Sequence, residues 1–270
     1  MRKNLNVEDL KKIQVELLDV LDSECKKHGL RYFLAYGTLI GAVRHKGYIP
    51  WDDDIDVIMP REDYDKLLSI FNDENKDSKV RVISHSIDKN YYLPFAKLVD
   101  TGTVLKENTQ SDYEIGVYID IFPLENLADD FEEAKKIIKK GFRYNKKLTL
   151  KNLVWRKGRA LYKNLALIIG KLALSCKSRS KILDDFEKYC CQNKAESFTK
   201  YVGVIAGVPY MRVFKREWFE QSVMLEFEGK QYSAPIGYDA FLRDIYGDYM
   251  QLPPEDKRCS HHSFEAWIKD

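Results

Sequence analysis

Paired cysteines and long apolar runs are absent from this sequence of 270 residues. Its five cysteines include no C-x-x-C pair, which argues against a zinc site or a disulfide framework and agrees with a reducing compartment. The longest apolar run, residues 165–170, is far shorter than the roughly 20 residues that a membrane span needs. The first residues have no apolar core like that of a secretory signal. We therefore expect a cytoplasmic protein.

Acidic side chains are missing from residues 134–183, a span that contains sixteen Lys and Arg residues. The rest of the chain has 28 of the 44 basic residues and all 42 acidic ones, so a segment of charge +16 is joined to a remainder of charge −14. Because the segment also contains Leu, Ile and aromatic residues, it has the composition of an amphipathic helix at an anionic membrane surface. A solvated helical face and a surface for a polyanionic glycan or nucleic acid are the alternatives.

The overall composition, 44% hydrophobic and 32% charged residues, is typical of a globular protein. Its length allows one large domain or a catalytic domain with a smaller companion. We predict three parts: a core of residues 1–128, a basic helical segment of residues 129–197, and a C-terminal α/β segment of residues 198–270 that packs back on the core.

Hydrophobic periodicity and turn residues predict the elements within these parts. Helices are expected at residues 7–28, capped by Asn6 and ended by Gly29, at residues 61–71 and 239–246, and in two or three pieces of residues 129–194, broken near 149 and 176. Strands are expected at residues 31–36, 54–59, 80–84, 92–99, 103–106, 117–122, 201–205 and 211–214, followed by a hairpin of residues 223–227 and 231–233. A turn at residues 100–102 separates two of these strands.

Much of the chemistry of the chain is concentrated in residues 33–60, FLAYGTLIGAVRHKGYIPWDDDIDVIMP. An apolar strand is expected to lead into Gly37 and Thr38, followed by a short helix. A Gly-Thr turn before a helix presents backbone N–H groups and a hydroxyl where an anion is favoured. Arg44 and Lys46, near the far end of the short helix, are candidate phosphate contacts, with exposed surface charge as the alternative.

Acidic side chains follow this helix. Because side chains alternate along a strand, Asp54 and Asp56 are expected to share one face. Neighbouring carboxylates repel each other unless a cation such as Mg²⁺ lies between them. Asp52 and Asp53 are adjacent and are further candidate ligands. Asp120 lies in a later apolar strand, where a carboxylate is costly to bury unless it is paired or bound to metal; a single hydrogen-bonded Asp is the alternative.

This order of signals, a Gly-Thr turn, a short helix, a strand with D-x-D and a later strand with a third Asp, resembles the nucleotidyltransferase superfamily. The longer sequence GTLIGAVRHKGYIPWDDDID resembles the LicD family of phosphocholine transferases, which also includes the fukutin-related phospho-sugar-alcohol transferases. The resemblance continues through FAKLVD, VYIDIFPL and YGDYMQLPPEDKR and so covers most of the chain. It implies an α+β fold, with a nucleotidyltransferase-like mixed sheet flanked by helices and the basic helical segment as an insertion.

The resemblance also implies an activity, the Mg²⁺-dependent transfer of phosphocholine from CDP-choline to a hydroxyl of a cell-surface glycan precursor, with release of CMP. The precursor would be of teichoic acid or lipopolysaccharide type. Asp54, Asp56 and Asp120 match the catalytic and metal-binding acids, with Mn²⁺ as an alternative ion, and Gly37 and Thr38 match the turn that approaches the nucleotide phosphates. Whether Asp120 is a metal ligand or the base stays open.

The implied partners are the CDP-choline donor and a lipid-linked glycan acceptor, and no nucleic acid is expected. Such an acceptor would be met at the inner face of the cell membrane, where the basic segment would bind anionic lipid. Choline has a quaternary ammonium group that donates no hydrogen bond, so proteins surround it with aromatic faces or acids. The aromatic candidates near the motif are Tyr36, Tyr48, Trp51, Tyr91 and Tyr92.

Other readings of the same residues stay open. The donor could instead be CDP-ribitol or CDP-glycerol, or a nucleoside triphosphate whose nucleotidyl group is transferred. A non-enzymatic reading takes the basic segment as a nucleic-acid-binding surface. This last reading is disfavoured because it leaves the Gly37-Thr38 turn and the distant Asp120 unexplained.

Overall fold

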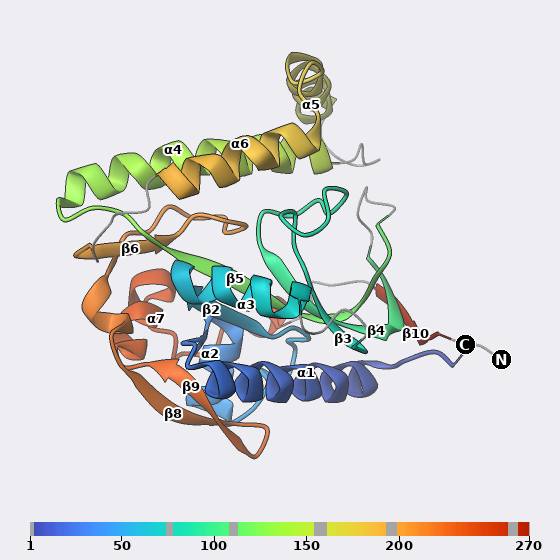
Figure 1. The fold of residues 1–270 in the computed structure, drawn as a ribbon, viewed down its shortest axis with the longest axis vertical. Coiled ribbons are helices and arrows are strands. Elements are labelled where there is room, and N and C mark those ends of the chain that lie inside the picture. The colour runs from blue at the N-terminus through green and yellow to red at the C-terminus, as the bar shows by residue number, and fades with distance from the viewer. Residues whose placement is uncertain are drawn as a thin grey trace.

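A mixed β-sheet forms the centre of the computed structural model, which describes residues 3–73, 78–107, 113–153, 161–192, 199–258 and 264–269 (Figure 1). Its eight strands within these residues are β1 (Phe33–Leu34), β2 (Asp56–Pro60), β3 (Val80–Ile83), β4 (Ala96–Glu107), β5 (Ile115–Asn126), β6 (Tyr201–Val204), β7 (Phe214–Lys215) and β10 (Phe264–Ile268). The order is β1-β2-β5-β4-β10, with β3 also paired to β4, and β6 paired to both β5 and β7. The β2–β5 pair is parallel, and the other pairs are antiparallel.

Helices flank this sheet, as the sequence predicted. They are α1 (Val7–His28), α2 (Tyr36–His45), α3 (Arg61–Asp73), α4 (Phe131–Asn152), α5 (Leu161–Ala173), α6 (Arg179–Gln192) and α7 (Tyr238–Tyr246), with short 3₁₀ turns η1 (Arg216–Phe219) and η2 (Glu255–Lys257). In Figure 1, α4 and α6 form a layer above the sheet, and α1 lies below it. A separate hairpin of β8 (Ser222–Phe227) and β9 (Lys230–Pro235) lies beside α1.

The predicted α+β class with a basic helical insertion is confirmed. Helices α4, α5 and α6 follow β5 and precede β6, and β6 pairs with β5, so the chain returns to the same sheet after the insertion. The division of the chain into three parts at residues 128 and 197 stays a prediction. Within the described residues, none of the helices is both long enough and apolar enough to cross a bilayer.

Helix α1 has the predicted bounds because both of its ends are set by local chemistry. The side chain of Asn6 accepts a hydrogen bond from Asp9 N–H, and Asp9 reciprocates in a capping box. Gly29 ends the helix with φ of 64°, a conformation that costs glycine little. Leu17 and Leu21, which lie on one face of the helix, are fully buried against the sheet.

The acidic strand begins two residues later than predicted. Strand β2 starts at Asp56, and Asp54 lies in the loop before it, so the expectation that the two share a strand face is wrong. The reason is that Asp52 N–H donates a hydrogen bond to Ile49 O in a turn. Asp56 N–H donates to the hydroxyl of Thr38 and not to a neighbouring strand. Strand β2 therefore begins only at Asp56, where this loop ends.

Other strand predictions also need correction. Strand β1 has only Phe33 and Leu34 of the predicted residues 31–36, because α2 already begins at Tyr36, and the predicted strand 92–99 begins only at Ala96. Strand β4 runs through the predicted turn at residues 100–102, where its register with β5 shifts at a bulge, because Gly102 N–H bonds to Asp100 Oδ1. Residues 211–213 are not a strand, and β7 has only Phe214 and Lys215. The C-terminal strand β10 was not predicted, and its pairing with β4 joins residues that are far apart in sequence.

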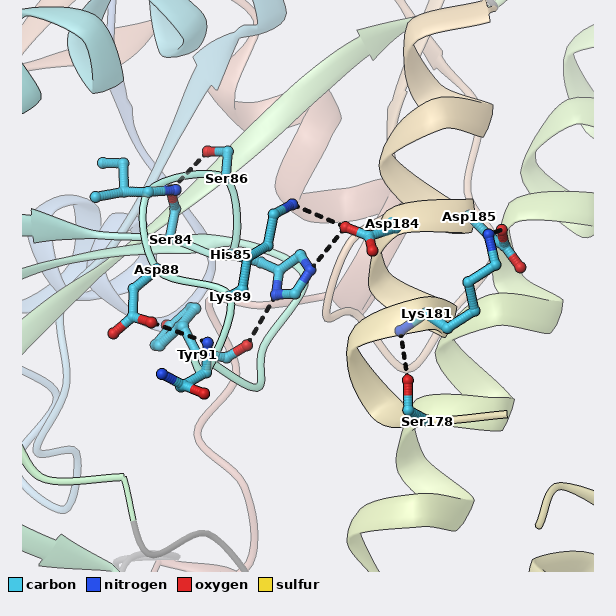
Figure 2. Close-up of polar contacts among 12 residues, drawn as sticks. Ser84, His85, Ser86, Asp88, Lys89, Tyr91, Ser178, Lys181, Asp184 and Asp185 are labelled. Carbon is cyan, nitrogen blue, oxygen red and sulfur yellow. Dashed lines mark hydrogen bonds and ion pairs between the residues drawn. The ribbon is translucent and has the colours of Figure 1, made fainter. Parts of the chain in front are cut away.

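Helix α6 is held to the sheet through the segment between β3 and β4 (Figure 2). His85 lies 3.0 Å from Asp184 Oδ1 through Nε2 and 3.1 Å from the carbonyl oxygen of Tyr91 through Nδ1. Lys89 Nζ donates to the same Asp184 oxygen at 2.8 Å. His85 is buried, so this contact fixes the helical insertion on the core.

Candidate active site

Three polar side chains lie side by side across three adjacent strands. Asp56 at the start of β2 is the register partner of Asp120 in the parallel strand β5. Asp120 is in turn the register partner of Lys97 in the antiparallel strand β4. Because residues directly opposite each other in a sheet point to the same face, the structure brings the two predicted acids together and adds a lysine to them. Asp120 is thus the central member of an Asp56–Asp120–Lys97 row.

The loop before β2 adds more carboxylates to this row. The side-chain oxygens of Asp52, Asp53 and Asp54 lie within 4.8 Å of one another. Removal from water raises the pKa of Asp56 well above its ordinary value, and the charges of Asp54, Asp120 and Asp52 raise it further, while Lys97 opposes them. So much negative charge in one place is unfavourable without a cation. Several carboxylate oxygens are also the ligands that Mg²⁺ prefers, so the residues present fit a divalent ion.

Lys97 is a site residue that was not predicted from the sequence. Its ammonium nitrogen lies 2.5 Å from Asp120 Oδ1 and 3.2 Å from the centre of the Tyr118 ring, and only 3% of the side chain is exposed. In the sequence, a lysine between the apolar residues Ala96 and Leu98 is no signal of a site, since alternation alone predicts a solvent-facing position. Burial of a charge beside a carboxylate instead indicates a functional or structural ion pair.

Gly37 and Thr38 lie in the first turn of α2 and contact the acidic loop. Thr38 is buried, and its hydroxyl accepts a hydrogen bond of 2.8 Å from Asp56 N–H. A side chain at Gly37 would meet the carboxylate of Asp52, so the start of the helix and the acidic loop lie close together here. The turn therefore positions the acids. Its expected contact with nucleotide phosphates stays a prediction.

Arg44 and Lys46 lie at the other end of α2, about 9 Å or more along the helix axis from Thr38. Arg44 Nη1 donates to the carbonyl oxygen of Tyr249 at 2.6 Å, so its guanidinium group joins α2 to the C-terminal segment. Lys46 is exposed, has φ of 60°, and accepts a hydrogen bond at its carbonyl oxygen from Glu228 N–H. Phosphate binding by either residue stays a prediction.

Three tyrosines surround Asp56 on the side of α7. Tyr36 is buried, and its hydroxyl interacts with that of Tyr210. Burial raises the pKa of Tyr36, and Tyr210 and Asp56 raise it further. Tyr246 keeps 46% of its surface exposed, yet its hydroxyl is desolvated, and this, followed by the charge of Asp56, raises its pKa. Of these three, only Tyr36 was a candidate from the sequence.

The other aromatic candidates have partners within the fold. Tyr48 is buried and hydrogen-bonded to α1. Tyr91 and Tyr92 are buried and pack against each other, with ring centres 5.7 Å apart. The guanidinium group of Arg258 lies 5.7 Å from the ring of Trp51. Ring packing or hydrogen bonding within the fold therefore involves four of the five predicted aromatic residues.

Known proteins are similar to this chain in sequence. Residues 29–158 match the family described as LicD/FKTN/FKRP, nucleotidyltransferase domain. The lipopolysaccharide cholinephosphotransferase LicD of Haemophilus influenzae is 30% identical over 271 residues, which cover 98% of this chain and 99% of that protein. The uncharacterized protein RP689 of Rickettsia prowazekii is 42% identical over 62 residues, 23% of this chain and 21% of that protein.

The matched family region includes every residue predicted for the site, from Gly37 to Asp120. The similarity to the Haemophilus protein extends further, over the helical insertion and the C-terminal segment. The expected family is therefore confirmed, and with it the expectation that the protein is a transferase enzyme. On this evidence, the chain belongs to the LicD family.

Proposed function

We propose that the protein transfers phosphocholine from CDP-choline to a hydroxyl of a cell-surface glycan precursor and releases CMP. The name of the full-length Haemophilus relative, a lipopolysaccharide cholinephosphotransferase, supports transfer onto a precursor of lipopolysaccharide type, with a teichoic acid precursor as the alternative acceptor. The observation that carries the proposal is the side-by-side placement of Asp56 and Asp120, close to the charge of Asp54.

A divalent ion belongs to this proposal. Asp54, Asp56 and Asp120 would hold Mg²⁺, with Mn²⁺ as an alternative, and Asp52 is near enough to contribute. The raised pKa of Asp56 supports such an ion, because it reflects removal of the carboxylate from water and, after that, the negative charge of Asp54, Asp120 and Asp52. When bound, the ion would neutralise the pyrophosphate of the donor and stabilise the charge that develops on the departing CMP.

The side chains of the protein orient the reacting groups. The oxygen of the acceptor hydroxyl forms a bond to the phosphorus of the phosphocholine group while the bond from that phosphorus to the CMP oxygen breaks. Asp120 accepts the proton of the acceptor hydroxyl or, if it holds the ion instead, that proton passes to water, and in either role Lys97 fixes the orientation of its carboxylate. Gly37 and Thr38 would lie against the donor phosphates, with Arg44 and Lys46 as further phosphate contacts.

The tyrosines beside Asp56 support choline as the transferred alcohol. An exposed aromatic face next to carboxylates attracts a quaternary ammonium, and Tyr246 offers such a face beside Asp52, Asp54 and Asp56. Ribitol or glycerol would instead require hydrogen-bond partners. The hydroxyls of Tyr36 and Tyr210 could provide them, so a comparison of donors distinguishes the alcohols.

The test is a comparison of donors. The purified full chain is incubated with lipid-linked glycan and CDP-choline, CDP-ribitol, CDP-glycerol or a nucleoside triphosphate, with Mg²⁺ or with EDTA. We expect Mg²⁺-dependent release of CMP from CDP-choline, at a rate at least about tenfold above the other CDP donors. Release of pyrophosphate from a triphosphate, with no CMP from any CDP donor, would overturn the proposal in favour of nucleotidyl transfer.

We place the enzyme in the cytoplasm, at the inner face of the cell membrane. A lipid-linked acceptor is anchored in that membrane, and the basic helical insertion would bring the protein to it.

A further inference from the structure

Helix α5 exposes a continuous apolar face. The exposed fractions of its apolar side chains are 69% for Tyr162, 57% for Leu165, 43% for Ile168, 59% for Ile169 and 66% for Leu172. At 100° per residue, these five positions fall within an arc of about 120° on one side of the helix. Figure 1 shows α5 projecting from the α4–α6 layer, on the side away from the sheet. A patch of this kind marks a surface that binds another partner.

The opposite side of α5 is packed against the protein. Asn164 is buried, with 2% of its surface exposed. A side chain at Gly170 would meet Leu150 of α4, so the two helices approach each other closely at this glycine. The exposed stripe is therefore the outer face of a docked helix.

The positive charge around α5 indicates which kind of partner its apolar face binds. No acidic residue occurs in residues 134–183, and Lys146, Lys151, Lys171 and Lys177 in the neighbouring turns are exposed or half-buried. A second copy of the chain would bring two such basic segments together, which is unfavourable. Nucleic acid would use the charges but leave the five apolar side chains in water. An anionic bilayer fits both the apolar face and the basic residues around it, since apolar side chains enter the acyl boundary while lysines contact the headgroups.

A groove lies next to the contact between α4 and α5. It has a volume of ≈ 500 Å³ and lies beside the last turns of α4, between Leu150, Leu153 and Phe95. The ring of Phe95 is 4.4 Å from that of Phe122, which is 5.7 Å from that of Tyr36, next to Asp56. The groove is therefore lined at one end by Leu150, at the α4–α5 contact, and at Phe95 it borders aromatic residues that pack beside Asp56.

We propose that α5 is a membrane-docking helix, which inserts its face of Tyr162, Leu165, Ile168, Ile169 and Leu172 into the surface of an anionic phospholipid bilayer. The groove then opens towards the membrane in which an acceptor is anchored. This last link to the acceptor rests on the proposed function, whereas the docking itself does not.

Vesicle sedimentation with the full chain tests the docking. The double variant Leu165→Glu/Ile169→Glu is compared with the wild type and with Val7→Glu/Met224→Glu, which places the same charges at exposed apolar positions outside the insertion. On vesicles containing phosphatidylglycerol, the α5 variant should bind at least about tenfold more weakly, and the control should bind as the wild type does. Circular dichroism should show all three folded.

Equal binding by the α5 variant and the wild type would overturn the proposal. So would wild-type binding that is as strong on pure phosphatidylcholine, or a dimer in sedimentation velocity that the α5 variant disrupts. CMP release with a water-soluble glycan acceptor separates the two proposals. If no donor is turned over but the α5 variant still loses the vesicles, the proposed chemistry fails while the docking stands.

Discussion

The carboxylate of Asp56 shares its surroundings with those of Asp54, Asp120 and Asp52, and its raised pKa reflects removal from water together with their charge. Replacing Asp56 by Asn removes one of these repelling charges and keeps the shape of the side chain. We predict that Asp56→Asn makes the metal-free protein more stable, by roughly 1 kcal/mol or a few degrees in Tm, while turnover falls by orders of magnitude.

Thermal unfolding in EDTA and in Mg²⁺ measures this effect. Glu16→Gln, which removes an exposed charge on α1, should leave both Tm and turnover unchanged. Saturating Mg²⁺ should raise the Tm of the wild type more than that of Asp56→Asn, because an ion stabilises the state that binds it. A metal-free Asp56→Asn protein less stable than the wild type would contradict this account of the site.

Lys97 is a positioning residue in this arrangement, since it acts through Asp120. We predict that Lys97→Met lowers kcat by about ten- to a hundredfold, because the Asp120 carboxylate loses its fixed orientation, and leaves the KM for the donor within about twofold. Lys106→Met is the matched control, because Lys106 is an exposed lysine of the same strand. Equal kcat values for the two variants would show that Lys97 has no such role.

The contrast between the acids and Lys97 shows what can be predicted about a site from sequence. The D-x-D pair and Asp120 stand out because carboxylates are rare in apolar strands, and the structure does bring Asp56 and Asp120 side by side. Their roles stay predictions. Lys97 could not be placed, because its partner is set by the register between β4 and β5, which depends on contacts between distant segments.

Strand β5 and helix α3 are joined by a buried ion pair. Arg61, at the start of α3, donates to both carboxylate oxygens of Glu125, and the two side chains are 8% and 4% exposed. We predict that Glu125→Ala lowers the free energy of unfolding by about 3–5 kcal/mol, because it leaves the Arg61 charge buried without its main partner. Urea unfolding, with the midpoint and the slope both fitted, measures the loss.

Asp65→Ala provides the control on the same arginine. Asp65 also pairs with Arg61, at 3.2 Å, but its side chain is 35% exposed. Its loss should cost about 1 kcal/mol or less, as expected for a pair near solvent. Similar losses for the two variants would mean that burial does not determine the contribution of this pair.

Helices and strands differ in how far their bounds could be predicted. Helix α1 was predicted to the residue, because Asn6 and Gly29 cap it through local hydrogen bonds. The β8–β9 hairpin was recovered for the same reason, since Glu228 and Gly229 both adopt positive φ in its two-residue turn. Strand β10 has no local signal of this kind, because it exists through its pairing with β4.

The whole molecule is divided by charge, with +16 in residues 134–183 and −14 in the rest. The acids of the active site belong to the negative part, and the exposed face of α5 belongs to the positive part. A negatively charged membrane would therefore attract one side of the molecule and repel the other. The protein would bind with α5 towards the lipid and with the groove between α4 and Phe95 at the membrane side.

This orientation predicts a specific dependence on salt. Between about 0.1 M and 1 M salt, the screening length falls from about 10 Å to about 3 Å, so attraction of the lysines to the bilayer weakens. Turnover with a membrane-embedded acceptor should then fall by about tenfold, whereas turnover with a water-soluble acceptor should change by less than about twofold. In Leu165→Glu/Ile169→Glu, membrane-acceptor turnover should be low already at the lower salt concentration. A parallel fall with both acceptors would place the salt effect at the catalytic residues and contradict an oriented enzyme at the membrane.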